Sequence, residues 1–104
     1  MNQVSIVTNS SASAVSNTAS VLGAAGVQYQ VVGFDGSSNG QAFRVALRVG
    51  DKVRAIMEGT AGTTVGRGFD FSGPVSGVGS SLAVTVTPAA SDLCHANLYY
   101  RIVY

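Results

Sequence analysis

The sequence is poor in charge and cysteine, and each shortage excludes a class of protein. Of its 104 residues only 11% are charged, whereas an average globular domain has about 25%. Six basic and five acidic residues give a net charge of +1, so there is no polybasic surface to bind a nucleic-acid backbone. Cys94 is the only cysteine in the sequence, which excludes a disulfide framework within the chain.

Long apolar runs are also missing. The longest are only a few residues, far below the roughly 20 that span a bilayer. Residues 1–8 contain no Lys or Arg, and polar residues follow directly, unlike the basic start and apolar core of a secretory signal. We therefore expect a soluble protein made in the cytoplasm, with no membrane or nucleic-acid partner, that forms a single β domain over residues 1–104.

Side chains that carry catalysis or bind metals are few and scattered. His95 is the only histidine, and the spacing of the five acids singles out no pair. Cys94 and His95 are adjacent, so in an extended chain they point to opposite faces and do not share one metal ion. We expect a protein that is not an enzyme and that has no metal and no cofactor.

Charge is distributed unevenly along the chain. Residues 1–34 and 71–91 carry no charged side chain, and most charges lie between Asp35 and Asp70. Depletion of charge is typical of the buried centres of subunit interfaces, and a domain this small gains stability by oligomerising. We therefore predict that other subunits cover much of the neutral surface. The alternative is that these segments are neutral loops and strands of a solvated domain.

Alternating apolar residues predict strands along most of the chain. Gly- and Ser-rich turns separate them, which favours an all-β antiparallel sandwich or jelly roll of about seven or eight short strands. We expect residues 35–40 to form a turn. Residues 1–26 are expected to be extended or irregular, with one short helix within residues 12–25 as an alternative. The expected strands are residues 4–7, 27–34, 42–49, 53–58, 63–71, 81–87 and 97–104.

The hairpin within residues 42–58 allows its register to be predicted. A two-residue turn at 50–51 would set charges against the apolar face, whereas a three-residue turn over 50–52 keeps apolar residues opposite each other. The second register also sets Arg48 opposite Arg54, and we expect these two to contact an anion or a carboxylate of a partner. The predicted pairs are Val49 with Val53, Leu47 with Ala55, Val45 with Met57, and Arg44 with Glu58.

The last strand is rich in tyrosine. Its alternation places Leu98, Tyr100, Ile102 and Tyr104 on one face and Tyr99, Arg101 and Val103 on the other. Tyrosine often packs its ring in an interface and leaves its hydroxyl in water. Together with the neutral start of the chain, this strand supplies the predicted interface residues: Val4, Ile6, Tyr99, Tyr100 and Tyr104.

Two resemblances follow from these features. The Gly-, Ser-, Ala- and Val-rich β domain, the uncharged residues 1–34 and the final strand ending at Tyr104 resemble small structural proteins of tailed-bacteriophage virions, of the capsid decoration (cement) or head-fibre type. Residues 47–53, Leu-Arg-Val-Gly-Asp-Lys-Val, resemble the Gly-Asp-x-Val hairpin of trimeric jelly rolls of the tumour-necrosis-factor and complement type, and residues 71–73 match a Phe-Ser-Gly segment that follows there. That second resemblance covers roughly a quarter of the chain.

The resemblances imply a non-enzymatic virion protein that decorates or cements a capsid. It would be made in the host cytoplasm, form a homo-oligomer with a trimer favoured, and contact a major capsid protein or another virion protein. A carbohydrate-binding β-sandwich module is the first alternative, and it predicts loss of glycan binding on Tyr99→Ala or Tyr100→Ala. A small hydrolase that depends on His95 or one of the acids is the second.

Overall fold

The computed structural model describes residues 6–69 and 72–103, and every regular element in these ranges is a strand. The described residues contain no helix, and thus none of the length and hydropathy that a bilayer crossing requires. The all-β prediction is therefore confirmed, with eight strands. They are β1 (Ile6–Ala14), β2 (Asn17–Val21), β3 (Tyr29–Ser38), β4 (Phe43–Val49), β5 (Lys52–Gly59), β6 (Thr64–Gly68), β7 (Leu82–Pro88) and β8 (Asp92–Ile102).

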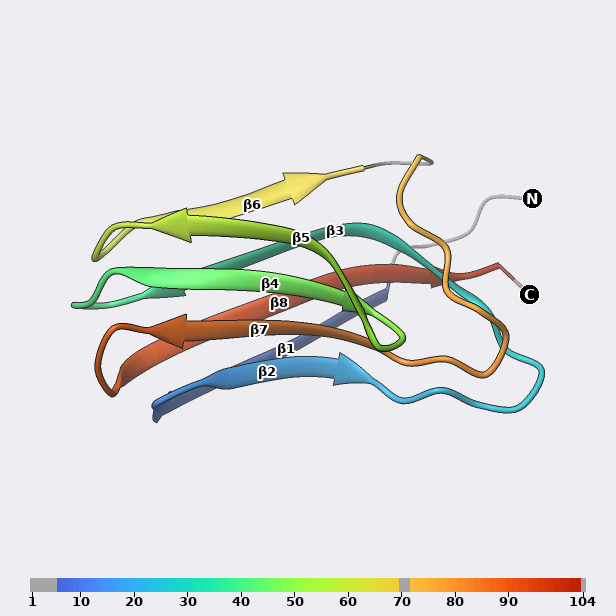
Figure 1. Cartoon of the computed structure of the whole chain (residues 1–104), viewed down its shortest axis with the longest axis horizontal. Coiled ribbons are helices and arrows are strands. Elements are labelled where there is room, and N and C mark those ends of the chain that lie inside the picture. The colour runs from blue at the N-terminus through green and yellow to red at the C-terminus, as the bar shows by residue number, and fades with distance from the viewer. Residues whose placement is uncertain (1–5, 70–71, 104) are drawn as a thin grey trace.

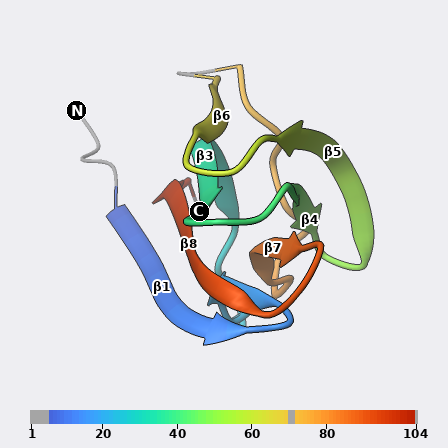
Figure 2. The same ribbon diagram turned by 90° about the vertical axis from the view of Figure 1, so that its left-hand side faces the viewer.

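The strands form a sandwich of two antiparallel four-stranded sheets (Figure 1). The first sheet has the order β1-β8-β3-β6 and the second has the order β2-β7-β4-β5. Strand β1 pairs with β8, β2 with β7, β3 with β6 and β4 with β5, so the chain folds as a long hairpin of four strand pairs wound across two sheets. This winding defines a jelly roll. Figure 2 shows β1 at the outer edge of the first sheet, beside β8.

The core lies between the two sheets and follows the predicted alternation. Val45 and Leu47 of β4, Val84 of β7 and Leu98 of β8 are completely buried, and their sequence neighbours face outward. Alternate side chains of a strand point to opposite faces, so period-two apolar residues fill one layer between two sheets. Gly36 of β3 belongs to this packing, because a side chain there would overlap the methyl groups of Val45 and Val86.

The β4–β5 hairpin combines the two registers considered for it. Leu47 lies opposite Ala55, and the pairs Val45–Met57 and Arg44–Glu58 also form as predicted. At the turn, however, Val49 pairs with Lys52, so the loop has two residues and the three-residue turn is wrong. The register shifts after Leu47, which leaves Arg54 as an extra residue on β5. Such a β-bulge lets a short turn coexist with an apolar inner face.

Some expected element bounds are wrong. Residues 35–38 continue β3 instead of forming a turn, because they pair with β8 on one side and, at 35–37, with β6 on the other. The helix considered within residues 12–25 does not form, since Ala12–Ala14 belong to β1 and Asn17–Val21 to β2. Within the segment expected to be extended or irregular, residues 6–14 and 17–21 are paired strands. The last strand begins at Asp92, five residues before the expected start.

Candidate functional site

Exposed aliphatic side chains gather at one end of the elongated molecule, which measures 41 × 22 × 19 Å. The described residues include ten exposed large hydrophobic side chains, and seven lie at the end where β1 begins and β8 stops (Figure 1). Leu22 is 79% exposed and Val78 is 56% exposed. We call this set the apolar end: Ile6, Val7, Leu22, Val75, Val78, Ile102 and Val103.

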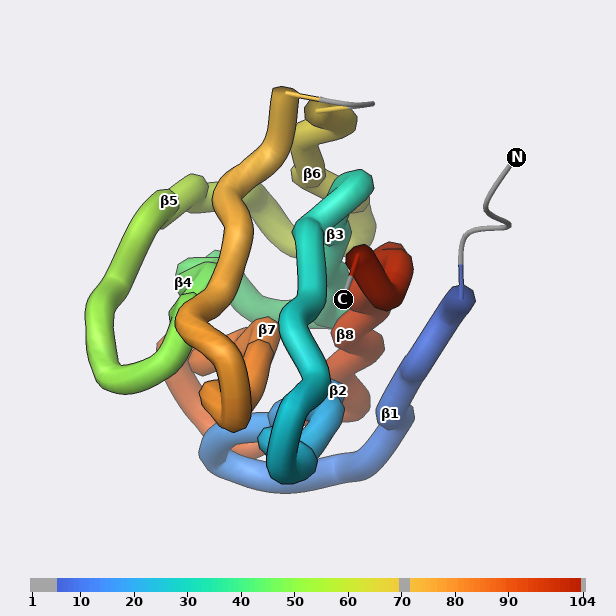
Figure 3. The backbone as a smooth tube through the Cα atoms, turned by 90° about the vertical axis from the view of Figure 1, so that its right-hand side faces the viewer, coloured from blue at the N-terminus to red at the C-terminus, as the bar shows by residue number. Residues whose placement is uncertain are grey.

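Two uncharged loops form most of the apolar end. Residues 22–28 join β2 to β3, and residues 74–79 run beside the start of β3, as the orange and cyan segments of Figure 3 show. Backbone hydrogen bonds hold them together: the Gly79 amide donates to the Val27 carbonyl, and the Ser76 amide donates to the Tyr29 carbonyl. The exposed side chains therefore belong to loops whose backbone is held in place by hydrogen bonds.

The loops also approach each other too closely for a side chain at Gly23. A Cβ atom there would overlap the carbonyl oxygen of Gly79. The hydroxyl of Tyr29 donates to the Leu22 carbonyl at 2.9 Å, and the hydroxyl of Ser81 accepts from the Gly23 amide at 2.8 Å. These contacts fix Leu22, which carries the most exposed aliphatic side chain of the apolar end.

The predicted interface residues of the terminal segments do not share one surface. Ile6 is 39% exposed and belongs to the apolar end, whereas Tyr99 lies on the outer face of the first sheet. Tyr100 turns inward as its place in the strand predicted, and its ring edge packs against Tyr29 with centroids 5.4 Å apart. The burial of the Tyr100 hydroxyl, followed by the proximity of Tyr29, raises its pKa. Val4 and Tyr104 lie outside the described residues.

The predicted pairing of Arg48 with Arg54 is wrong, because a bulge in β5 shifts the register. Arg48 lies opposite Val53, and Arg54 has no cross-strand partner in the β4–β5 ladder. The two guanidinium groups are therefore not a cross-strand pair. Their contact with an anion or a partner carboxylate stays a prediction.

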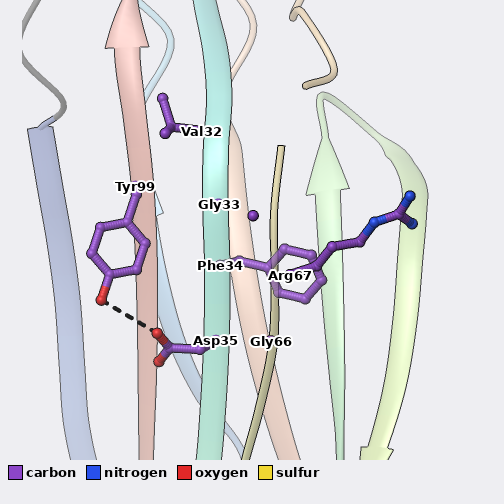
Figure 4. Close-up of a pocket in the computed structure, with 8 residues that line it drawn as sticks. Val32, Gly33, Phe34, Asp35, Gly66, Arg67 and Tyr99 are labelled. Atoms are coloured by element: carbon purple, nitrogen blue, oxygen red, sulfur yellow. Dashed lines mark hydrogen bonds between the residues drawn. The ribbon is translucent and has the colours of Figure 1, made fainter. Parts of the chain in front are cut away.

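A second candidate site is a groove of about 420 Å³ on the outer face of the first sheet, between β8, β3 and β6 (Figure 4). The Asp35 carboxylate accepts a hydrogen bond from the Asn97 amide at 2.6 Å and one from the Tyr99 hydroxyl at 3.3 Å. Burial, followed by the charge of Asp35 and its hydrogen bond, raises the pKa of Tyr99. Tyr99 therefore stays protonated and remains a donor at neutral pH.

The groups considered for catalysis and metal binding lie apart. Cys94 is fully buried, whereas His95 points to the outer face, where its Nδ1 lies 2.6 Å from the Ser11 hydroxyl. The prediction that these neighbours point to opposite faces is confirmed. In residues 6–69 and 72–103, no three His, Cys, Asp or Glu side chains gather where they could hold a metal ion. Asp92 lies at the opposite end of the sandwich from the apolar end, and its carboxylate accepts hydrogen bonds from the Ser38 hydroxyl and the Gly40 amide.

Neither candidate site was visible in the sequence as a motif. The apolar end combines one or two aliphatic residues from each of four segments: the first strand, two loops, and the end of the chain at and after the last strand. The groove depends on three glycines whose pattern indicates only flexible or closely packed strands. The uncharged segments were the one signal for the apolar end, because both of its loops fall within them.

Comparison of the sequence with protein-family models and with curated proteins finds no match. Several solved structures are similar in fold. One is the CBM36-1 domain of a multidomain xylanase from the hindgut metagenome of Trinervitermes trinervoides, with 13% identity, a TM-score of 0.42, and coverage of 99% of this chain and 98% of that one. Another is a carbohydrate-binding module CBM36 in complex with calcium and xylotriose, with 11% identity, a TM-score of 0.38, and coverage of 84% and 71%.

A third similar structure is the virus-like particle of the extra small virus of the giant freshwater prawn Macrobrachium rosenbergii. It has 13% identity and a TM-score of 0.45, and the match covers 96% of this chain and 78% of that chain. Identities and TM-scores this low carry no argument about function or partners.

Proposed function

We propose that this protein is a non-enzymatic structural subunit of a virus particle, of the bacteriophage type, that decorates or cements a capsid. The observation that carries the proposal is the apolar end, where seven aliphatic side chains are exposed together. Large exposed apolar surfaces mark interaction sites, whereas single exposed aliphatic residues are ordinary. Jelly rolls serve as particle subunits among other roles.

The first partner of the apolar end is a second copy of the chain. Close to a rotation axis, equivalent residues of the subunits face one another, so a charged residue there would meet like charge. The loops 22–28 and 72–81 contain no charged residue, and the nearest charges are Asp51 and Lys52 in the β4–β5 turn, which contacts Ser81 through Gly50. A standard interface buries about 800 Å² per partner, roughly one-seventh of the 5555 Å² of accessible surface. One end of an elongated molecule can supply that area.

We favour a homotrimer that meets at the apolar end and then binds the major capsid protein or another virion protein. Its effect on the particle follows from mass action, because a subunit that binds only the assembled lattice stabilises that lattice. No bond needs to be made or broken in this role. The protein would act in the virion after synthesis in the host cytoplasm.

The proposal is tested by one double variant with a matched control. We expect Leu22→Ser combined with Val78→Ser to weaken self-association about 100-fold or more, since burying each side chain contributes about 1.5–3 kcal/mol. Val15→Ser changes a side chain that is 73% exposed but lies at the opposite end of the sandwich, and it should leave the association unchanged. Sedimentation velocity over a concentration series measures both. Equal masses for the double variant and the wild type would overturn the proposal.

A further inference from the structure

The groove on the first sheet borders the apolar end, because Tyr99 in its wall is the cross-strand partner of Val7, but the rest of its lining lies outside the apolar end. Its floor lacks side chains, because Gly33 of β3 pairs with Gly68 of β6, and Gly66 of β6 pairs with Asp35. A Cβ atom at Gly66 would overlap the Phe34 carbonyl oxygen, so the close approach of the strands requires glycine there. At Gly68, by contrast, a Cβ atom would meet nothing within 4 Å. The glycines thus leave an open hollow between the side chains of neighbouring strands.

The walls of the hollow carry fixed polar groups. Figure 4 shows the Tyr99 ring on one side of β3, with its hydroxyl directed to the Asp35 carboxylate, and Arg67 on the other side. Both hydrogen-bond donors to Asp35 are neutral groups, the Asn97 amide and the Tyr99 hydroxyl. Each carboxylate oxygen accepts one of these bonds and keeps further acceptor capacity. The Arg67 side chain points to the other face of the sheet, because Arg67 pairs with the buried Phe34, and its guanidinium lies 5.0 Å from the centre of the Phe69 ring.

We propose that this groove binds a neutral saccharide. The oriented carboxylate of Asp35 accepts hydrogen bonds from sugar hydroxyls. The Tyr99 ring offers an apolar surface to the C–H groups of a pyranose. At about 420 Å³ the hollow falls within the size range of ligand sites, which is roughly 300–1,000 Å³.

Other ligand classes fit the same groups less well. An apolar ligand would remove water from the Asp35 carboxylate without replacing its hydrogen bonds, which is costly. A phosphate or a nucleic-acid strand would meet the negative charge of Asp35 at close range. A neutral polyhydroxylated ligand supplies donors to the carboxylate and introduces no charge of its own.

The test titrates isotope-labelled protein with neutral oligosaccharides of glucose, xylose, mannose, galactose and N-acetylglucosamine, followed by amide chemical shifts. We expect at least one sugar to shift the amides of Gly33, Gly66 and Gly68 in a saturable manner. If no neutral sugar does so, the proposal is wrong. Glucosamine, which is cationic, is titrated in the same way. If it alone shifts these amides, the proposal is also wrong, because the carboxylate would then be a cation site.

Three variants locate the binding. Gly68→Val fills the hollow at a position where a side chain meets no atom, and we expect binding to weaken about tenfold or more. Tyr99→Ala removes the ring and should have a similar effect, whereas Tyr99→Phe removes only the hydroxyl and should weaken binding about three- to tenfold. Thr18→Val, on the second sheet, is the control and should bind as the wild type does. Unchanged affinity in Gly68→Val would overturn the assignment, with the amide spectrum verifying that the variant is folded.

The two proposals fail independently, because different variants and different measurements test them. A protein that binds sugars as a monomer would support the groove and contradict the assembly. A salt-resistant oligomer that binds no neutral sugar would support the assembly and contradict the saccharide site.

Discussion

The two ends of the sandwich are built in different ways. At the apolar end, backbone and side-chain hydrogen bonds hold two loops, and the exposed side chains are aliphatic. The opposite end, which we call the polar end, consists of short turns (Figure 1), and polar side chains there form hydrogen bonds within the molecule. The amide of Asn17 donates to the carbonyls of Ser10 and Cys94, and Asp92 accepts from Ser38 and Gly40.

The difference separates stability from association. The side chains that stabilise the polar end are engaged within the molecule, so they are not available to a partner. At the apolar end, the backbone and the side chains of Tyr29, Ser76 and Ser81 hold the loops, so the exposed aliphatic side chains stay accessible to a partner. Substitutions at the polar end should therefore change stability alone, and those at the apolar end should also change association.

The largest effect on stability is expected from Gly23→Ala at the apolar end. The added methyl group would overlap the Gly79 carbonyl and force the two loops apart, at a cost of about 2–3 kcal/mol. Self-association should weaken as well. Gly40→Ala at the polar end is the control, because the nearest atom to its Cβ would be Asp92 Oδ2 at 3.8 Å. Urea unfolding and sedimentation measure the two effects, and equal stability of the two variants would contradict the account.

A smaller effect is expected from Asn17→Leu at the polar end. Asn17 is 7% exposed, and its amide lies 2.7 Å from the Ser10 carbonyl and 3.0 Å from that of Cys94. Loss of these bonds should lower the free energy of unfolding by about 1–2 kcal/mol, as measured in urea. Thr18→Val, on the neighbouring exposed position, should cost less than about 0.5 kcal/mol. A change in the mass of the assembly in Asn17→Leu would contradict the expectation that substitutions at the polar end change stability alone.

The smallest effect concerns Asp92 and pH. The hydrogen bond from Ser38, followed by that from the Gly40 amide, lowers the pKa of Asp92 below its ordinary value of 3.8. The stabilisation is thus present above about pH 4 and is lost as the pH falls through the lowered pKa. The difference in Tm between the wild type and Asp92→Asn should be present at pH 6 and shrink toward pH 2. A difference that is independent of pH would contradict this role for the carboxylate.

The sequence predicted the layers of the sandwich because its inner faces alternate strictly. Val45, Leu47, Val84 and Leu98 are buried as their spacing indicated. Cross-strand pairing also predicted most of the β4–β5 register. The bulge at Arg54 could not be predicted. It is a local irregularity that allows the two-residue turn and the apolar inner face to form together.

The parts that escaped prediction depend on tertiary pairing. Strand β1 has no fully buried residue, so no alternation of apolar residues marks it, and its pairing with β8 alone defines it. The end of β3 contains Asp35, Gly36 and two serines, which are typical of a turn. They are strand residues because β6 and β8 flank them. Both candidate sites likewise join distant segments, and only the fold brings them together.

The central claim is that the neutral, apolar end of this molecule is a surface for association between copies of the chain. Light scattering after size exclusion, at low and at high salt, tests it most directly. The account predicts an oligomer, with a trimer favoured, whose mass is the same in both buffers, because contacts between uncharged surfaces are not screened by salt. A monomer in both buffers, or an oligomer that dissociates at high salt, would contradict it.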